Sequence, residues 1–177
     1  GEWWVTNGQR SLSNNSVCYT ERPDAGVFMR EWESLYSSKS GERGLFSRVA
    51  AQEQAARSGR RDSSFEFGTN PCSEIILRPN QFCNLSECVV RAEDNPSTLK
   101  DKVRLATMLG TLQSTLVNFR YLSPKWQRNT AEERLLGVSL TGIMDNSTLN
   151  VPSDLCGDIL EQLKEEAIRT NASVSSL

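Results

Sequence analysis

The sequence predicts an α/β fold with mostly parallel strand pairing, and three observations support this. Short stretches with the character of strands alternate with longer stretches of helical periodicity along the 177 residues. The helical stretches are long enough to cross over a sheet, which a parallel strand pair requires. The composition, 37% hydrophobic and 24% charged, is ordinary for a soluble globular protein, and the length is that of about one domain.

The first half of the chain is predicted to hold two short strands and two helices. In order, these are strands over residues 3–6 and 16–20 and helices over residues 27–36 and 45–57. Trp32 and Tyr36 lie one helical turn apart, and we expect them in the core rather than on a surface that stacks bases. The polar linker over residues 58–64 contains Arg60 and Arg61, which either bind phosphate or lie in a solvated loop. Its composition favours the solvated loop.

The second half is predicted to be mainly helical. The expected elements are a helix over residues 96–121, a short helix that opens at the capping box of residues 130–133, either a strand or a tight crossing against that helix over 137–143, and a helix over 153–168. Ser97 is the expected N-cap of the first helix, whose many apolar residues predict burial over much of its circumference. The polar residues 170–177 are expected to fray.

The stretch over residues 67–83 carries the most distinctive chemistry of the chain. Asn70, Cys72 and Glu74 occupy every second position, and in an extended backbone such residues project to the same side, roughly 7 Å apart. Pro71 fixes its own φ and biases Asn70 toward the extended region. We therefore expect an amide, a thiol and a carboxylate to face one volume.

A second thiol, Cys83, follows eleven residues after Cys72, past a predicted turn at Pro79-Asn80. The chain contains no histidine, so Cys72 has no imidazole base that would make it a Cys–His nucleophile. A carboxylate in a partly dry pocket takes a proton from a substrate hydroxyl, and two thiols supply reducing equivalents and end as a disulfide. A thiol that loses a hydrogen atom becomes a thiyl radical. This set of groups fits the radical removal of a sugar hydroxyl.

The segment Asn70-Pro71-Cys72-Ser73-Glu74 resembles the active-site loop of the ribonucleotide reductase large chain. Other pieces match that family in the family's own order, and they cover residues 13–16, 40–46 and 133–145. The short spacing from Cys72 to Cys83 is similar to that of the monomeric adenosylcobalamin-dependent class, which reduces ribonucleoside triphosphates. The resemblance spans most of this chain but only a central part of the family's much longer chain.

The resemblance implies that residues 1–177 are a fragment of a ten-stranded α/β barrel, with the catalytic cysteine on a central finger loop at about residues 67–83. Cys72 would form the thiyl radical that abstracts the ribose 3′-hydrogen. Glu74 would deprotonate the 3′-hydroxyl, Asn70 would hydrogen-bond the sugar hydroxyls, and Cys83 would be one of two reducing cysteines. The residues expected to contact the substrate are Ser13, Asn14, Asn15 and Ser16.

The same resemblance implies adenosylcobalamin as the radical source and a ribonucleoside triphosphate as the substrate, with the diphosphate left open. It also implies two partners: a dithiol reductant such as thioredoxin, and the remaining segments of the reductase chain. The family's second reducing cysteine lies upstream of the central loop, and Cys18 does not match its position. The family's phosphate-binding Pro-Ser-Gly-Thr loop has no counterpart either. The isolated chain is therefore expected to show little or no turnover.

Two further interpretations stay open beside the enzyme. The chain is either a split or truncated subunit that completes the barrel only with partner chains, or an inactive binding or structural relic. The start at Gly1 instead of Met favours a processed chain or a piece of a longer one. A fragment leaves sheet edges and apolar helix faces uncovered unless another piece covers them.

Charge and cysteine content narrow the partners and the compartment. The net charge of −2 gives no case for nucleic acid or an anionic membrane, and no apolar run is long enough to span a bilayer. The five cysteines are odd in number and irregularly spaced, which predicts a reducing, cytoplasmic setting rather than a secreted disulfide framework. Cys83 and Cys88 have poor spacing for zinc, so no metal site is expected. Cys18 is expected to be a small buried residue, and Cys88 to end a strand.

Overall fold

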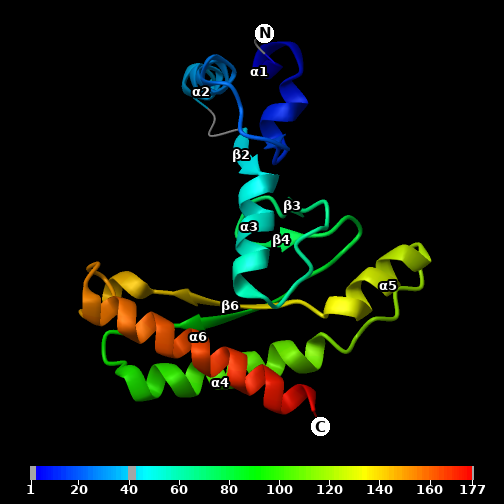
Figure 1. Ribbon diagram of the computed structural model, residues 1–177. Coiled ribbons are helices and arrows are strands. Elements are labelled where there is room, and N and C mark those ends of the chain that lie inside the picture. Colours follow the sequence, from blue (N-terminus) through cyan, green and yellow to red (C-terminus); the bar gives the residue numbers. More distant parts are fainter. Residues whose placement is uncertain (1–2, 40–42, 177) are drawn as a thin grey trace. The chain divides into compact units, whose positions relative to one another are not determined.

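The chain divides into two compact units, Gly1–Gln81 and Phe82–Leu177, and each unit is described here by itself. The structure is a computed structural model that describes residues 3–39 and 43–176. Both units combine helices with short pairs of strands, as Figure 1 shows. Among the residues described, two of the three strand pairs are parallel and one is antiparallel.

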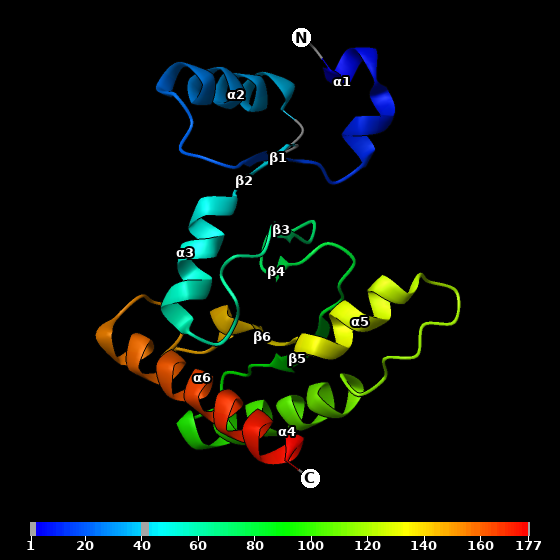
Figure 2. The same cartoon turned by 45° about the vertical axis from the view of Figure 1, so that its right-hand side comes forward.

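The first unit is built on one pair of parallel strands joined by a helix. Strand β1 (Ser16–Tyr19) pairs with β2 (Gly44–Ser47), and α2 (Ala25–Ser38) forms the connection between them (Figure 2). A helix in this place is required because two parallel strands cannot be joined by a tight turn. The other elements are α1 (Trp3–Thr6), the 3-10 helix η1 (Gly8–Leu12), α3 (Arg48–Ser58), β3 (Gly68–Thr69) and β4 (Ile76–Leu77).

Short polar side chains set the limits of the first unit's helices. The carboxylate of Asp24 accepts hydrogen bonds from the N–H groups of Gly26 (2.8 Å) and Val27 (3.3 Å), which caps the start of α2. The hydroxyl of Ser47 accepts from the N–H of Ala50 at 3.2 Å and caps α3 in the same way. Gly59 ends α3 in the left-handed region, at φ 63°.

The core of the first unit is small and aromatic. Phe67 is fully buried, and it packs with Phe46 and with Ala51 and Ala55 of α3. The guanidinium of Arg61 lies over the Phe67 ring, 4.7 Å from its centre, and donates to the carbonyl of Ile76 at 2.7 Å. Arg61 therefore supports this core. The sequence offered phosphate binding or a place in a solvated loop for Arg61, and neither describes these contacts.

Three sequence-based expectations for the first unit are wrong. Residues 3–6 form the helix α1 rather than a strand. The predicted helix over 45–57 begins only at Arg48, because the preceding residues form β2. Helix α2 has no buried residue: Trp32 is 54% exposed and Tyr36 is 79% exposed, so neither belongs to a core. Helical spacing identified α2 correctly, but spacing alone does not show that a partner surface is present.

The second unit is also built on a parallel strand pair. Strand β5 (Asn84–Val89) pairs with β6 (Leu136–Thr141), and the chain between them forms α4 (Pro96–Gln113) and α5 (Pro124–Glu133). After β6 come the 3-10 helix η2 (Ile143–Asp145) and the long helix α6 (Asp154–Ser175). Helix α4 packs against both strands, and α6 runs alongside α4, as both cartoon views show.

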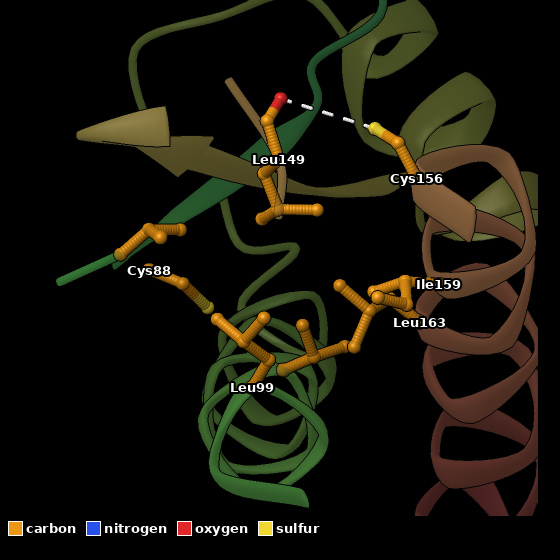
Figure 3. Close-up of a cluster of buried hydrophobic side chains, with 8 residues drawn as sticks. Cys88, Leu99, Leu149, Cys156, Ile159 and Leu163 are labelled. Carbon is orange, nitrogen blue, oxygen red and sulfur yellow. Dashed lines mark hydrogen bonds between the residues drawn. The ribbon is translucent and has the colours of Figure 1, made fainter. Parts of the chain in front are cut away.

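A cluster of buried side chains joins these layers, and Figure 3 shows it in close-up. Cys88 and Val90 come from the end of β5, Leu99 from α4, and Ile159 and Leu163 from α6. Burial raises the pKa of the Cys88 thiol above its ordinary value of 9.0, so this sulfur is a packed apolar group rather than a reactive thiolate. Cys88 lies one residue before the end of β5, as the sequence predicted.

Asn146 connects the turn after β5 to the turn after β6. Its buried side chain donates to the carbonyls of Arg91 (3.1 Å) and Asp94 (2.9 Å) and accepts from the N–H groups of Thr148 (3.1 Å) and Leu149 (3.3 Å). All four hydrogen-bonding positions of the amide are therefore used. The result is a polar link inside an otherwise apolar region.

The helix limits of the second unit differ from the prediction at several points. Helix α4 ends at Gln113 rather than near residue 121, and its N-cap is Asn95 rather than Ser97. The pattern over 130–133 does not open a helix, because it forms the end of α5, which begins at Pro124. Helix α6 continues to Ser175 although its last residues are polar.

The apolar stripe of α4 is the largest departure from the sequence-based prediction. Leu105, Leu109 and Leu112 are between 60% and 63% exposed, while Leu99 and Val103 are buried. The prediction of burial around much of the helix is therefore wrong for the residues that the structure describes. Among those residues, no helix has the length and apolar character needed to cross a membrane.

Asp94 provides a test of the second unit through pH. Its carboxylate pairs with Lys102 and accepts from the N–H of Arg91 at 2.8 Å, and the hydrogen bond from Lys102 lowers the pKa of Asp94 below its ordinary 3.8. A lowered pKa stabilises the fold at pH values above 3.8, and this stabilisation is lost as the pH falls through the lowered pKa. We predict that Asp94→Asn reduces the free energy of unfolding at neutral pH, because the variant loses the charge that pairs with Lys102. The expected reduction is only about 1 kcal/mol, because water screens the half-exposed lysine.

Urea unfolding of wild type and Asp94→Asn at neutral pH and at roughly pH 3 measures this effect. The difference between the two proteins should shrink at the lower pH. Asp101→Asn is the matched control, because the Asp101–Arg104 pair is exposed and should contribute little. A difference that stays constant with pH would contradict the role assigned to Asp94.

Candidate active site

The residues singled out around Cys72 lie at the tip of a short hairpin. Strands β3 and β4 pair antiparallel, and residues 70–75 connect them. The side-chain oxygen of Asn70 accepts from the N–H of Ile75 at 3.1 Å, and the carbonyl of Asn70 accepts from the N–H of Ser73 at 3.1 Å. The hydroxyl of Thr69 donates to the carbonyl of Ile75 at 3.1 Å. Asn70 therefore closes the turn that carries the thiol.

The extended backbone expected for residues 70–74 is wrong. Residues 71–73 form a turn, and Ser73 adopts the left-handed region at φ 65°, which an L-residue other than glycine rarely occupies. Alternation of side chains along a strand therefore does not apply to Asn70, Cys72 and Glu74. Asn70 is half-buried, whereas Cys72 and Glu74 are both exposed. The turn predicted at Pro79-Asn80 is confirmed, and Asn80 has φ 56°.

A pocket of about 300 Å³ lies at the base of this hairpin. One wall comes from Asn14, Ser16 and Cys18, which occupy alternate positions leading into and along β1. Side chains at every second position therefore face one volume on β1, whereas we expected this arrangement around Cys72. The remaining lining comes from the end of β2, the start of α3 and the hairpin: Phe46, Arg48, Gly68, Thr69, Asn70 and Pro71.

The structure brings some of the predicted site residues together. Asn14 and Ser16, predicted to contact substrate, share the pocket with Asn70. Ser13 and Asn15 do not line it, because Asn15 donates to the Ser13 carbonyl at 2.8 Å and to the Ser13 hydroxyl at 2.9 Å, which closes the loop before β1.

Cys72 and Glu74 follow directly on the lining residues but are not themselves part of the lining. Cys83 belongs to the second unit, where its side chain is half-buried. Its joint action with Cys72 on one sugar stays a prediction.

Three pocket residues were missed or misjudged from the sequence. Cys18 was expected to be buried, but it is exposed and lines the pocket. Thr69 was not considered at all. Arg48 is the first residue of α3, and its Nε donates to the carbonyl of Phe67 at 2.8 Å. A cationic residue directly after a strand and at the start of a helix is typical of anion-binding sites, and this signal is present in the sequence.

The other stretches that resemble the reductase have structural roles in the described residues. Residues 40–42 of the 40–46 stretch lie outside the described residues. Gly44 lies so close to β1 that an added Cβ would be 2.7 Å from the hydroxyl of Ser16. The 133–145 stretch forms β6 and η2, and Gly142, at φ 76°, allows the chain to pass beside the carbonyl of Val90. Gly44 and Gly142 therefore shape the strand pairs, whereas Phe46 of the 40–46 stretch lines the pocket.

Comparison with known proteins gives one informative similarity. The chain is 33% identical over 147 residues to the adenosylcobalamin-dependent ribonucleoside-triphosphate reductase of Lacticaseibacillus paracasei. The match covers 77% of this chain and 18% of the reductase, so the chain corresponds to a segment of that relative. No protein-family model matches the chain, and no solved structure matches it either.

Ser73 provides a test of the turn that presents Cys72. A β-branched residue is poorly tolerated at positive φ, whereas glycine adopts this region without steric cost. We predict that Ser73→Val lowers the free energy of unfolding of the first unit by about 1–2 kcal/mol. Ser73→Gly should leave it unchanged or raise it by up to about 1 kcal/mol.

Chemical denaturation measured by near-UV circular dichroism reports both effects. Ser147→Val is the control, because Ser147 is exposed and lies outside the left-handed region. Equal stability of the valine and glycine variants at position 73 would show that the turn does not constrain this residue.

Proposed function

We propose that this chain is the catalytic segment of an adenosylcobalamin-dependent ribonucleoside-triphosphate reductase, which converts ribonucleotides to 2′-deoxyribonucleotides. One observation carries the proposal: the exposed thiol of Cys72 lies at the tip of a hairpin whose base shares a pocket with Asn14 and Ser16. The similarity to the Lacticaseibacillus reductase supports it. Because the chain spans 18% of that relative, the activity and the substrate are proposed for the completed protein.

The pocket has the polar groups that a nucleotide's sugar and phosphates require. The amides of Asn14 and Asn70 and the hydroxyl of Ser16 suit the hydroxyls of a ribose, because each both donates and accepts hydrogen bonds. The guanidinium of Arg48 and the start of α3 place positive charge at the same pocket, which favours phosphate oxygens. We therefore assign sugar binding to the hairpin and β1, and phosphate attraction to Arg48.

The proposed chemistry follows from the groups at the hairpin tip. The Cys72 sulfur radical takes the hydrogen atom from C3′, which forms an S–H bond and leaves a carbon radical on the sugar. The carboxylate of Glu74 takes the proton of the 3′-hydroxyl as a general base. The 2′-hydroxyl then leaves as water with a proton from one reducing thiol, and the other reducing thiol gives a hydrogen atom to C2′. The two sulfurs join as a disulfide, and the electron that they release, with the proton held by Glu74, restores the 3′-hydroxyl on a C3′ radical. Cys72 finally returns the hydrogen atom to C3′.

The reaction consumes two electrons, and a pair of thiols supplies them while becoming a disulfide. Cys83 is proposed as one of this pair. The second thiol would come from the remaining segments of the reductase chain, and a thioredoxin-like dithiol would reduce the disulfide after each turnover. The balanced change is one ribonucleotide and one dithiol to one deoxyribonucleotide, one disulfide and one water.

The residues present fit the implied cofactor. When bound, adenosylcobalamin supplies the one-electron oxidation that turns a thiol into a thiyl radical. Cys72 is exposed at a hairpin tip, so a large group can approach its sulfur. No cluster of three or more His, Cys, Asp or Glu suited to a metal ion occurs in residues 3–39 and 43–176. A cobalamin requires none, since its corrin ring holds the cobalt.

Replacement of Cys72 tests the radical chemistry. This chain would replace the corresponding segment of the Lacticaseibacillus reductase, so that the rest of that reductase supplies the segments that this chain does not contain. With adenosylcobalamin, a dithiol and ATP, we expect the hybrid to form 2′-deoxyribonucleotide, and Cys72→Ser to abolish it, because a serine hydroxyl holds its hydrogen atom far more strongly than a thiol. The loss should be at least about 10³-fold, as for other catalytic groups that act as a unit.

Chromatographic quantification of the deoxyribonucleotide measures this result. Ser147→Ala, at an exposed position outside the pocket, is the matched control and should keep the activity of the hybrid. Retained reduction in Cys72→Ser would remove the basis of the proposed function.

A second candidate, a split subunit that needs partner segments, is favoured by the open surfaces of the second unit. Asn84 and Val90 direct their N–H groups to the β6 side, at 2.9 Å from the Leu135 carbonyl and 2.8 Å from the Thr141 carbonyl. Residues between them alternate, so Leu85 and Glu87 direct their backbone groups to the opposite edge. In the described part of the chain no strand pairs with that edge.

A groove of about 530 Å³ follows this edge between β5 and the exposed face of α4. An open strand edge beside an apolar helix face fits an added strand and helix, which is the repeating unit of an α/β barrel. The proposed occupants are therefore the remaining segments of the reductase.

Substitution on the open face of α4 tests the requirement for partner segments. This chain would be co-expressed with the remaining parts of the Lacticaseibacillus reductase, and association measured by co-purification and sedimentation. We expect a stable complex with wild type, and Leu109→Glu should weaken it at least about tenfold, because a charge would be buried there. Gln113→Glu, exposed on the same helix, is the control. A dispersed monomer beside those segments would count against the split subunit.

A further inference from the structure

The two residues that flank Cys83, Phe82 and Asn84, contact residues 126–137, the segment that runs from α5 into β6, and the Cys83 sulfur lies close to Gly137 of the same segment. We propose that this segment positions the Cys83 thiol, with Trp126 as its main positioning residue. The importance of a positioned thiol rests on the proposed function, in which Cys83 is a reducing cysteine. The contacts themselves lie within the second unit and can be tested without catalysis.

The residue before Cys83 is held by aromatic rings. The ring of Phe82 stacks on Trp126 of α5, with ring centres 4.6 Å apart and planes inclined by 29°. The same Phe82 ring meets Phe119 edge-on, with centres 5.1 Å apart and planes inclined by 62°. Both geometries are favourable for aromatic pairs. Phe82 is 38% exposed, and these two ring contacts hold its side chain on the buried side.

The residue after Cys83 is held by a doubly bonded carbonyl. The N–H of Asn84 donates to the carbonyl of Leu135 at 2.9 Å, and the side-chain amide of Asn84 donates to the same carbonyl at 3.0 Å. Leu135 immediately precedes β6, so these bonds mark the start of the parallel ladder. The backbone on the carboxyl side of Cys83 is therefore fixed by the same segment that holds Phe82.

The thiol itself lies close to Gly137 of β6. A Cβ added to Gly137 would lie 3.8 Å from the Cys83 sulfur, which is ordinary van der Waals contact. The sulfur is also 3.8 Å from the carbonyl oxygen of Asn84, to which it donates a weak hydrogen bond. Cys83 is thus half-buried between two anchored neighbours and a strand that lacks a side chain at the point of contact.

This arrangement restricts the directions in which the sulfur can point. A reducing thiol must meet both the substrate and a second thiol, and fixed geometry removes much of the entropic cost of that encounter. Trp126 lies more than forty positions along the chain from Cys83 and carries no reacting group. Its effect on the thiol passes through the Phe82 ring.

Alkylation of the individual cysteines tests the proposal on the intact chain. The chain would be treated with iodoacetamide under native conditions, and the rate at Cys83 and Cys72 read separately by peptide mass spectrometry. Cys72 is exposed and serves as the internal reference, whereas modification of half-buried Cys83 requires local opening. We expect Trp126→Ala to raise the Cys83 rate by about threefold to tenfold, the range that one aromatic pair contributes, with the Cys72 rate unchanged.

Two further variants make the outcome specific. Trp126→Phe keeps a ring against Phe82 and should show the wild-type rate at Cys83. Phe82→Leu removes the other ring of the pair and should raise the Cys83 rate, so it tests the proposal even if Trp126→Ala fails to fold. Tyr121→Ala removes an aromatic ring that is 99% exposed nearby in the chain and should change neither rate.

An unchanged Cys83 rate in folded Trp126→Ala and Phe82→Leu would overturn the proposal, as would an equal rise at both cysteines. Because the readout is thiol reactivity, loss of the proposed reductase activity would not alter this result.

Discussion

Parallel pairing of two short strands is the constraint on which both units of this protein depend. A parallel pair needs a crossover connection, and the chain supplies α2 between β1 and β2 and the α4–α5 stretch between β5 and β6. A single pair has two open edges and cannot bury both of its faces. The exposed leucines of α4 and the exposed aromatic side chains of α2 follow from this incomplete layering. The same constraint therefore explains both the architecture and the exposed apolar surfaces of the described residues.

The pocket is a direct consequence of the parallel pair in the first unit. Alternate residues of β1 point to the same side, so Asn14, Ser16 and Cys18 form a wall without any special local geometry. The hairpin then brings Asn70 to that wall, the end of β2 contributes Phe46, and α3 contributes its first residue, Arg48. Ligands of open α/β sheets are generally bound where strands give way to helices, and this pocket lies at such a junction.

The two cysteines proposed to react are presented in different ways. Cys72 is exposed on a tight turn that the Asn70 side chain closes. The next residue in this turn, Ser73, adopts the left-handed region. Cys83 is half-buried, with aromatic stacking on one side and the doubly bonded Leu135 carbonyl on the other. An exposed tip suits a thiol that a large cofactor must reach, and an enclosed position suits a thiol that must keep a set direction. Cys88 and Cys156 are buried in the core of the second unit and take no part in this chemistry.

The sequence by itself determined several of the local elements and predicted the chemistry that is proposed for the site. Periodicity located α2, α6, β1 and β6, and the residue types of 70–74 indicated thiol chemistry at a loop. It could not decide the backbone of that loop, because the Asn70 side chain competes with an extended strand by bonding the N–H of Ile75. It also could not decide which apolar faces are covered or that Arg48 reaches the pocket. Those outcomes depend on contacts between segments distant in the chain, and only the tertiary structure brings such segments together.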